Sequence, residues 1–216
     1  MVKSLLFLVA TSILCCCKTS LKTFKTADTH KLGVKSSKFR GTIFDSTYDD
    51  AIIAFQQDLY PGRFTPNANE IILAEDILKS QIKQANTRRI NQFRRRQYID
   101  RNLNKYFRQY VGFVNKQGQR IIHINFHWNK FTLIDRLKGN WDDRLNYTSD
   151  YSRVLDGGSR FWNINVNLSE KKVYGMVVNG VAFITILPTT SVLQQAGLDR
   201  GTAATDRYSA SVVSRQ

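Results

Sequence analysis

Cysteine is nearly absent from this chain: three residues of 216, all within the first 17 positions. Cys15, Cys16 and Cys17 are adjacent, so they cannot link distant segments, and no cysteine follows them. The domain downstream of them therefore has no disulfide framework, no thiolate metal site and no cysteine nucleophile.

Other signatures of catalysis are also missing. The sequence has no phosphate-binding glycine loop, no His-Glu-x-x-His and no Gly-x-Ser-x-Gly. The neighbouring acids Asp49-Asp50 and Asp142-Asp143 are expected to point apart in loops, whereas acid/base catalysis by a pair needs carboxylates that face each other. Asp156-Gly157-Gly158 is better explained as a turn than as an anion-binding nest. The sequence thus identifies no catalytic residue and no cofactor.

Acidic residues are scarce, with 17 Asp and Glu against 32 Lys and Arg and a formal net charge of +15. Such an excess favours an anionic partner, either nucleic acid or an anionic membrane surface or envelope polymer. A third interpretation is that the charge only keeps the protein soluble. The location of the protein is needed to choose among these three.

The first residues indicate export. A cationic start at Lys3 and an apolar run from Leu5 to Leu14 are typical of a signal peptide, predicted over residues 1–16. The run is about half the ~20 residues that a membrane-spanning helix needs. Because it ends in cysteine, a set of merely buried or disulfide-bonded cysteines is the weaker interpretation.

The segment Leu14-Cys15-Cys16-Cys17 resembles the lipobox of bacterial lipoproteins, in which Leu lies three residues before the lipidated Cys. The resemblance implies a lipid on Cys17, with Cys16 as the alternative. It also implies a lipid-anchored protein of the cell envelope, at the outer membrane or facing the periplasm. Nucleic acid is then a disfavoured partner, because little of it lies in the envelope.

Periodicity divides the remaining chain. Residues 17–41, rich in Lys, Thr and Ser, are expected to form a flexible basic tether, residues 42–187 a single domain, and residues 188–216 a disordered tail. Apolar residues at spacings of three and four predict a helix over residues 67–85. Either Thr65-Pro66 or Asn67 with Glu70 would cap it.

After the helix the period changes to two. Strands are expected at residues 107–114, 120–128, 161–168, 173–178 and 181–187, with Asn179-Gly180 as the turn of the last hairpin. The predicted fold class is α+β: one long helix packed on an antiparallel sheet of four to five strands, in a cystatin-like layout.

Two sets of residues are candidates for binding. The basic segment 88–108 carries eight Lys or Arg and one acid. Its candidate anion contacts are Arg88, Arg89, Arg94, Arg95, Arg96 and Arg101. Such a segment, with interleaved aromatic residues, could form a groove for single-stranded nucleic acid, a contact with anionic lipid or polysaccharide, or a solvated helix face whose arginine stems cover apolar surface.

The second set is a polar face of the sheet. Alternation places Ile122, Ile124 and Phe126 toward the helix. The opposite face would hold His123, Asn125, His127, Asn163, Asn165 and Asn167. His123 and His127 would be about 13 Å apart on a strand, too far to share one zinc ion. A solvated surface is favoured over a ligand site, and no metal is expected.

Several motifs in the same order resemble small exported lipoproteins of Bacteroidota. They are Tyr106 to Asn115, Gly118, Ile124-Asn125-Phe126, Asp156 to Trp162, Asn167-Leu168 and Asn179 to Ala182. The resemblance covers about residues 98–182 and implies export and a single domain, with no activity to carry over. The expectation is a non-catalytic envelope lipoprotein that contacts anionic lipid, polymer or a protein partner. The alternative is an envelope enzyme with an unrecognised site.

Overall fold

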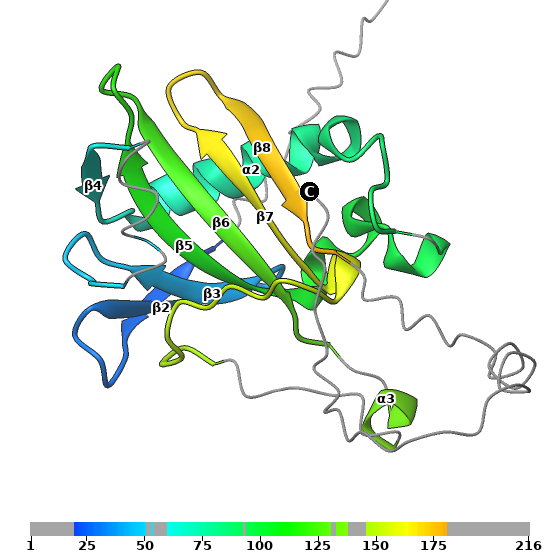
Figure 1. The fold of residues 1–216 in the computed structure, drawn as a ribbon. Coiled ribbons are helices and arrows are strands. Elements are labelled where there is room, and N and C mark those ends of the chain that lie inside the picture. Colours follow the sequence, from blue (N-terminus) through cyan, green and yellow to red (C-terminus); the bar gives the residue numbers. More distant parts are fainter. Residues whose placement is uncertain are drawn as a thin grey trace, which may run out of the picture. The chain divides into compact units, whose positions relative to one another are not determined.

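A computed structural model describes residues 20–50, 53, 60–92, 94–130, 133–137 and 146–180. One sheet of eight strands dominates this part of the chain, and a single long helix lies across it (Figure 1). The strands are β1 (Lys22–Lys25), β2 (Lys31–Lys35), β3 (Arg40–Phe44), β4 (Gly62–Phe64), β5 (Tyr106–Val114), β6 (Arg120–Trp128), β7 (Phe161–Asn167) and β8 (Lys172–Val178).

The sheet is mixed rather than antiparallel. Its order is β1-β2-β3-β5-β6-β7-β8, and β3 and β5 run parallel. Strand β4 pairs with the last residues of β5, beyond the stretch that pairs with β3. The expected antiparallel sheet of four to five strands in a cystatin-like layout is therefore wrong.

Two of the four extra strands, β1 and β2, and the start of a third, β3, come from residues that the composition assigned to a tether. From Lys22 to Phe44 the chain forms three consecutive strands, so the expectation of a flexible segment over residues 17–41 is wrong from residue 20 on. Lysines are frequent here because β1 is an edge strand, exposed at every residue. Charged side chains on an edge strand prevent unwanted pairing with other strands. They also make the amino-acid composition of an edge strand similar to that of a flexible linker.

The helix α2 (Ala68–Ala85) confirms the predicted helix almost to the residue. Asn67 caps it: its side chain accepts from the backbone N–H of Asn69 and Glu70, while the Glu70 carboxylate accepts from the Asn67 N–H. This reciprocal pair is a capping box, so Asn67 rather than Thr65 begins the helix.

The main core lies between α2 and the sheet. Ile122, Ile124 and Phe126 face this side, as the alternation of β6 predicts. The Trp162 and Phe126 rings stack with centroids 3.7 Å apart, and Trp162 is fully buried. Strands β5, β6, β7 and β8 otherwise confirm the predicted bounds within one residue.

A second, smaller core covers the opposite face of the sheet. Phe44, Val111, Phe113 and Ile121 pack there with Tyr151, which belongs to residues 146–153. These residues are called the cover segment below. Four side chains of four different strands donate hydrogen bonds to its carbonyl oxygens: Lys31 to Thr148, Thr42 to Tyr147, Gln109 to Asp150 and Asn125 to Ser152. The sheet is thus covered on both faces.

The short helix α3 (Leu133–Leu137) differs from the other elements in its exposure. Leu133, Ile134 and Leu137 are 73%, 62% and 78% exposed, so its apolar side chains face solvent. No helix of the described residues is long and apolar enough to cross a membrane.

Three sequence predictions lie outside the described residues: the signal peptide with its lipidated cysteine, the strand at residues 181–187 and the tail at residues 188–216. The strand pairings and the two cores of the described part of the chain lie between residues 20 and 180. A chain that begins at Ser20 therefore keeps them all and is expected to fold as a soluble form.

Candidate functional site

The arginine-rich segment does not continue α2 as a helix. It forms three 3-10 turns, Arg95–Gln97, Ile99–Arg101 and Leu103–Lys105, before β5 begins. Gln92 holds these turns from within: its amide exchanges two hydrogen bonds with Asn86 and accepts one from the Ile99 N–H. Gln92, Asn86 and Ile99 are buried, so this network acts in a low-dielectric setting where hydrogen bonds are strong.

The six candidate arginines divide into two groups. Arg88, Arg94, Arg95 and Arg101 are exposed and form what is called the arginine surface below. Arg89 is half-buried: it pairs with Asp100 and lies 4.0 Å from the centroid of the Tyr98 ring. The Arg89 guanidinium, with Asn86, holds the pKa of the Asp100 carboxyl below its usual range against the opposing effect of burial. The Arg96 side chain falls outside the described residues.

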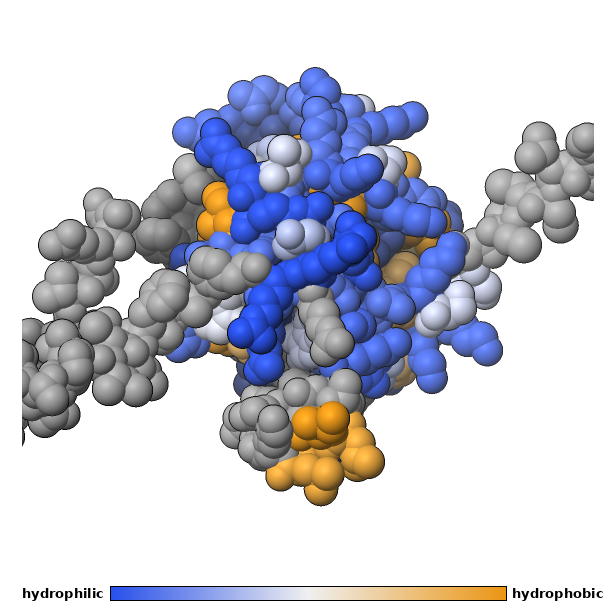
Figure 2. Space-filling view, turned by 90° about the vertical axis from the view of Figure 1, so that its right-hand side faces the viewer, coloured by the Kyte–Doolittle hydropathy of each residue, from blue (hydrophilic) through white to orange (hydrophobic). Residues whose placement is uncertain are grey.

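Figure 2 shows the face that carries these turns and β8, and hydrophilic residues dominate it.

The turn after α2 is held in an unusual conformation, with positive φ at Arg89 and Asn91. Non-glycine residues adopt this region only when their surroundings impose it. The Asn91 side chain supplies part of this constraint, because it donates to the Asn179 carbonyl oxygen at 2.6 Å.

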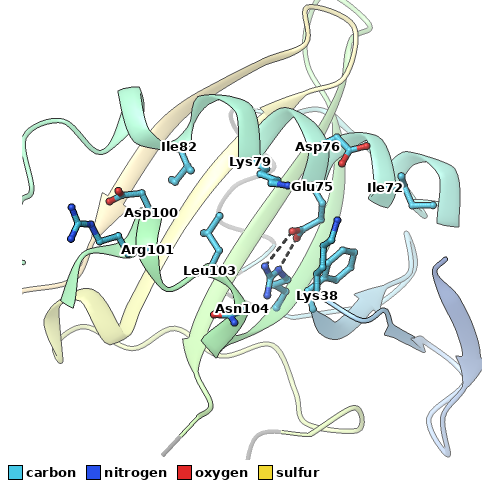
Figure 3. Close-up of a pocket in the computed structure, with 12 residues that line it drawn as sticks. Lys38, Ile72, Glu75, Asp76, Lys79, Ile82, Asp100, Arg101, Leu103 and Asn104 are labelled. Carbon is cyan, nitrogen blue, oxygen red and sulfur yellow. Dashed lines mark hydrogen bonds and ion pairs between the residues drawn. The ribbon is translucent and has the colours of Figure 1, made fainter. Parts of the chain in front are cut away.

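Beside these turns lies a cavity of about 450 Å³, called the α2 pocket. It is bounded by α2, by the turns at residues 100–104 and by Lys38-Phe39 (Figure 3). Phe39, Ile72, Ile82 and Leu103 supply its apolar lining, and Leu103 points from its turn toward α2. The volume falls within the roughly 300–1,000 Å³ of small-molecule sites.

A buried ion pair, Glu75 with Arg108, contributes to the lining of this pocket. Arg108 Nε donates to Glu75 Oε1 at 2.7 Å and Arg108 Nη2 donates to Oε2 at 3.2 Å, the contacts dashed in Figure 3. The Tyr110 hydroxyl donates to the same Oε1 at 2.8 Å. Arg108 is 2% exposed, and Phe39 and Phe126 lie 5.1 and 5.3 Å from its guanidinium.

The electrostatics of this cluster favour binding over proton transfer. Burial, reinforced by the Glu75 carboxylate, raises the pKa of Tyr110 well above its usual value. Tyr110 therefore stays protonated as a donor. Glu75 accepts three hydrogen bonds from Arg108 and Tyr110, so both of its carboxylate oxygens are engaged within the protein.

The six residues of the predicted polar face are brought together on β6 and β7. His123 pairs across the strands with Asn165, and Asn125 with Asn163. His123, Asn125 and His127 are buried, with 4%, 7% and 5% exposure. Of the cover segment, the Tyr151 ring lies near His123 and the Ser152 carbonyl oxygen contacts Asn125, while His127 contacts the Phe161 ring of β7. The favoured expectation of a solvated surface is therefore wrong for β6, because residues 146–153 return over the strand.

Hydrogen bonds on this face are internal. His123 Nδ1 donates to Asn165 Oδ1 at 2.8 Å, and the Asn125 amide lies within hydrogen-bond distance of Gln109, His127 and the Ser152 carbonyl oxygen. Asn167, at the end of β7, accepts from the N–H groups of Ser169 and Glu170. Within the described part of the chain no group of three His, Cys, Asp or Glu side chains could hold a metal ion.

Sequence reasoning missed the Glu75–Arg108 pair and the pocket above it. Arg108 alternates with Tyr106 and Tyr110 on β5, and those two are the residues of this strand that join the helix-side core. An arginine that faces the core from that position of the strand needs a buried carboxylate as its partner, and Glu75 lies on the facing helix.

Comparison of the chain with protein-family models, curated proteins and solved structures finds no match.

Proposed function

We propose that this protein is a non-catalytic, lipid-anchored binding protein of the bacterial cell envelope, whose arginine surface contacts anionic lipid or polymer. The observation that carries the proposal is the exposure of Arg88, Arg94, Arg95 and Arg101 on turns that are fixed from within by Gln92. The proposal also rests on the lipobox-like start of the chain.

Rigidity is what separates this surface from an ordinary solvated charge run. Binding by a flexible basic segment requires that the segment be ordered first, at a cost in conformational entropy. Here the backbone is already held by the Asn86–Gln92 bonds, the Arg89–Asp100 pair and the Asn91 contact with Asn179. The cations are therefore presented without that cost.

An enzymatic function would require two titratable groups that converge on one space. In the α2 pocket, Glu75 is engaged by Arg108 and Asp100 by Arg89. This arrangement supports binding better than acid/base chemistry.

The arginine surface gives a first prediction. In the soluble form beginning at Ser20, changing Arg88, Arg94 and Arg95 to Gln should weaken binding to dextran sulfate about 100-fold at low salt. Each cation near an anionic surface contributes about 1 kcal/mol, and ~1.4 kcal/mol corresponds to a tenfold change. Fluorescence titration across a salt series should show steep weakening for the unaltered protein and a shallower slope for the variant.

The matched control removes the same charge elsewhere. Lys22, Lys25 and Lys35 are exposed on β1 and β2, and changing them to Gln should cost far less affinity. Equal losses in the two variants would mean that net charge alone drives binding. An affinity insensitive to salt would contradict the proposal altogether.

The lipid anchor gives a second prediction. Changing Cys17 to Ala should yield an uncleaved precursor or a soluble form, and the unaltered protein should fractionate with membranes. Mass spectrometry of the mature N-terminus should find acyl groups on Cys17, and a Cys16→Ala variant tests the alternative site. Mature protein that is soluble and carries no acyl mass would refute the anchor.

A further inference from the structure

The α2 pocket combines an apolar wall with a buried cation, and its ligand can be inferred from that pairing. An arginine side chain has five N–H donors. In the described structure three atoms of Arg108 donate within the protein, through Nε and Nη2 to Glu75 and through Nη1 to the Tyr106 carbonyl oxygen. Among the described residues this leaves two N–H groups, one on each terminal nitrogen, on a side chain that lines the pocket.

The remaining charges of the lining also favour an anion. Lys38, Lys79 and Arg101 line the pocket together with Asp76, Asp100 and Glu75. Two of these carboxylates already pair with Arg89 and Arg108. Among the other charges of the lining, Lys79 and Arg101 outnumber the acid Asp76. In Figure 3, Lys79 lies beside Glu75 on α2, close to the ion pair, whereas Asp76 is turned toward the other side of the helix.

We propose that the α2 pocket binds an amphipathic anion, a single carboxylate or phosphate group on an apolar chain. The head accepts hydrogen bonds from the spare N–H groups of Arg108 and is neutralised by Lys79. The chain lies against Phe39, Ile72, Ile82 and Leu103. Arg101 borders both this pocket and the arginine surface. The ligand contacts proposed here use neither Arg101 nor Arg88, Arg94 and Arg95, so the inference goes beyond the proposed function and is tested independently of it.

Octanoate is a suitable probe for this site. The protein to be tested is the soluble form beginning at Ser20, after circular dichroism has shown that it unfolds cooperatively. Methyl NMR should show saturable shifts at Ile72, Ile82 and Leu103. Acetate and inorganic phosphate carry the head without the chain, and 1-octanol carries the chain without the charge. Each should bind at least about tenfold more weakly than octanoate, since charge-assisted hydrogen bonds and apolar burial both contribute.

Two matched pairs of variants locate the ligand. Leu103→Trp should fill the pocket and abolish the shifts, whereas Leu73→Trp, on a part of α2 that does not line it, should leave them unchanged. Lys79→Gln should weaken octanoate binding severalfold, whereas Lys83→Gln, one turn further along α2 and outside the lining, should not.

The role of Arg108 is tested by removing both charges of the ion pair together. The Glu75→Gln/Arg108→Gln double variant should lose the preference for octanoate over octanol. If that variant fails to fold, the comparison of octanoate with octanol and the Leu103 variant still decide the matter. Equal binding of octanol and octanoate, shifts confined to other residues, or no saturation by octanoate would each overturn the proposal.

Discussion

Replacing Arg108 with methionine should lower the free energy of unfolding by about 3–5 kcal/mol, the range found when one partner of a buried ion pair is removed. Methionine fills a similar volume among Phe39 and Phe126, so packing is nearly conserved. The Glu75 carboxylate, 11% exposed on its side chain, would lose its counterion and two hydrogen bonds. Urea unfolding of the soluble form, followed by circular dichroism, measures the change.

The charge left behind, rather than the lost pair, should account for most of this effect. Adding Glu75→Gln to Arg108→Met removes the uncompensated charge and keeps an oxygen that accepts from Tyr110, so most of the stability should return. Arg95→Met, at an exposed arginine, should change stability by less than about 0.5 kcal/mol. A loss below about 1 kcal/mol for Arg108→Met alone would show that water reaches Glu75 and that the cluster is not truly buried.

The helix and the four C-terminal strands of the described sheet could be predicted because their core faces are strongly periodic. Ile71, Leu78 and Ile82 repeat with the period of a helix, and Ile122, Ile124 and Phe126 with that of a strand. Both patterns arise because the apolar residues of the helix and those of the strand are buried against each other. The apolar stripe of α2 and the apolar face of β6 are two sides of one core.

Strands β1, β2 and β3 could not be predicted in the same way. Their stability depends on partners far along the chain: β3 runs parallel to β5, across more than sixty positions of sequence. Gly33 and Gly41 interrupt the alternation because the chain passes close to other groups there. A Cβ on Gly41 would lie 2.4 Å from the Arg108 carbonyl oxygen.

The candidate sites were predictable only as residue types. Composition identified the arginines as candidates. It could not show that Arg89 forms an ion pair with Asp100, or that Arg94 and Arg95 stay exposed to solvent. Alternation placed His123 on the face away from α2, but residues 146–153, which bury it, lie some twenty positions away and show no period. The local sequence pattern of a strand contains no information about which irregular segment, distant in the sequence, will pack against it.

Burial of His123 should make the protein lose stability as the pH falls from about 6.5, before most carboxylates begin to take up protons. Transfer of the ring from water to the space between the sheet and Tyr151 lowers the pKa of His123 to about 4, with the positive charge of Arg153 adding to the effect and the Asn165 hydrogen bond opposing it. The usual histidine pKa is about 6.5. His123 therefore stays neutral in the folded protein.

The sign of the effect follows from proton uptake. Well above pH ~6.5 His123 is neutral in both the folded and the unfolded state, and its full contribution to stability is present. As the pH falls, the unfolded chain binds a proton that the folded protein excludes, so stability is lost progressively down to pH ~4. The loss should be about 2 kcal/mol at pH 5 and about 3 kcal/mol near pH 4.

Urea unfolding at pH 7 and pH 5 tests this directly. His123→Asn places an amide nitrogen near the position of Nδ1, can still donate to Asn165, and does not titrate. This variant should be less stable than the unaltered protein at pH 7, because the smaller side chain leaves a cavity. It should nevertheless lose much less stability between pH 7 and pH 5. His30→Asn, at an exposed histidine, is the control and should keep most of the original pH dependence. An unchanged dependence in His123→Asn would show that the ring is hydrated and that residues 146–153 do not seal this face of the sheet.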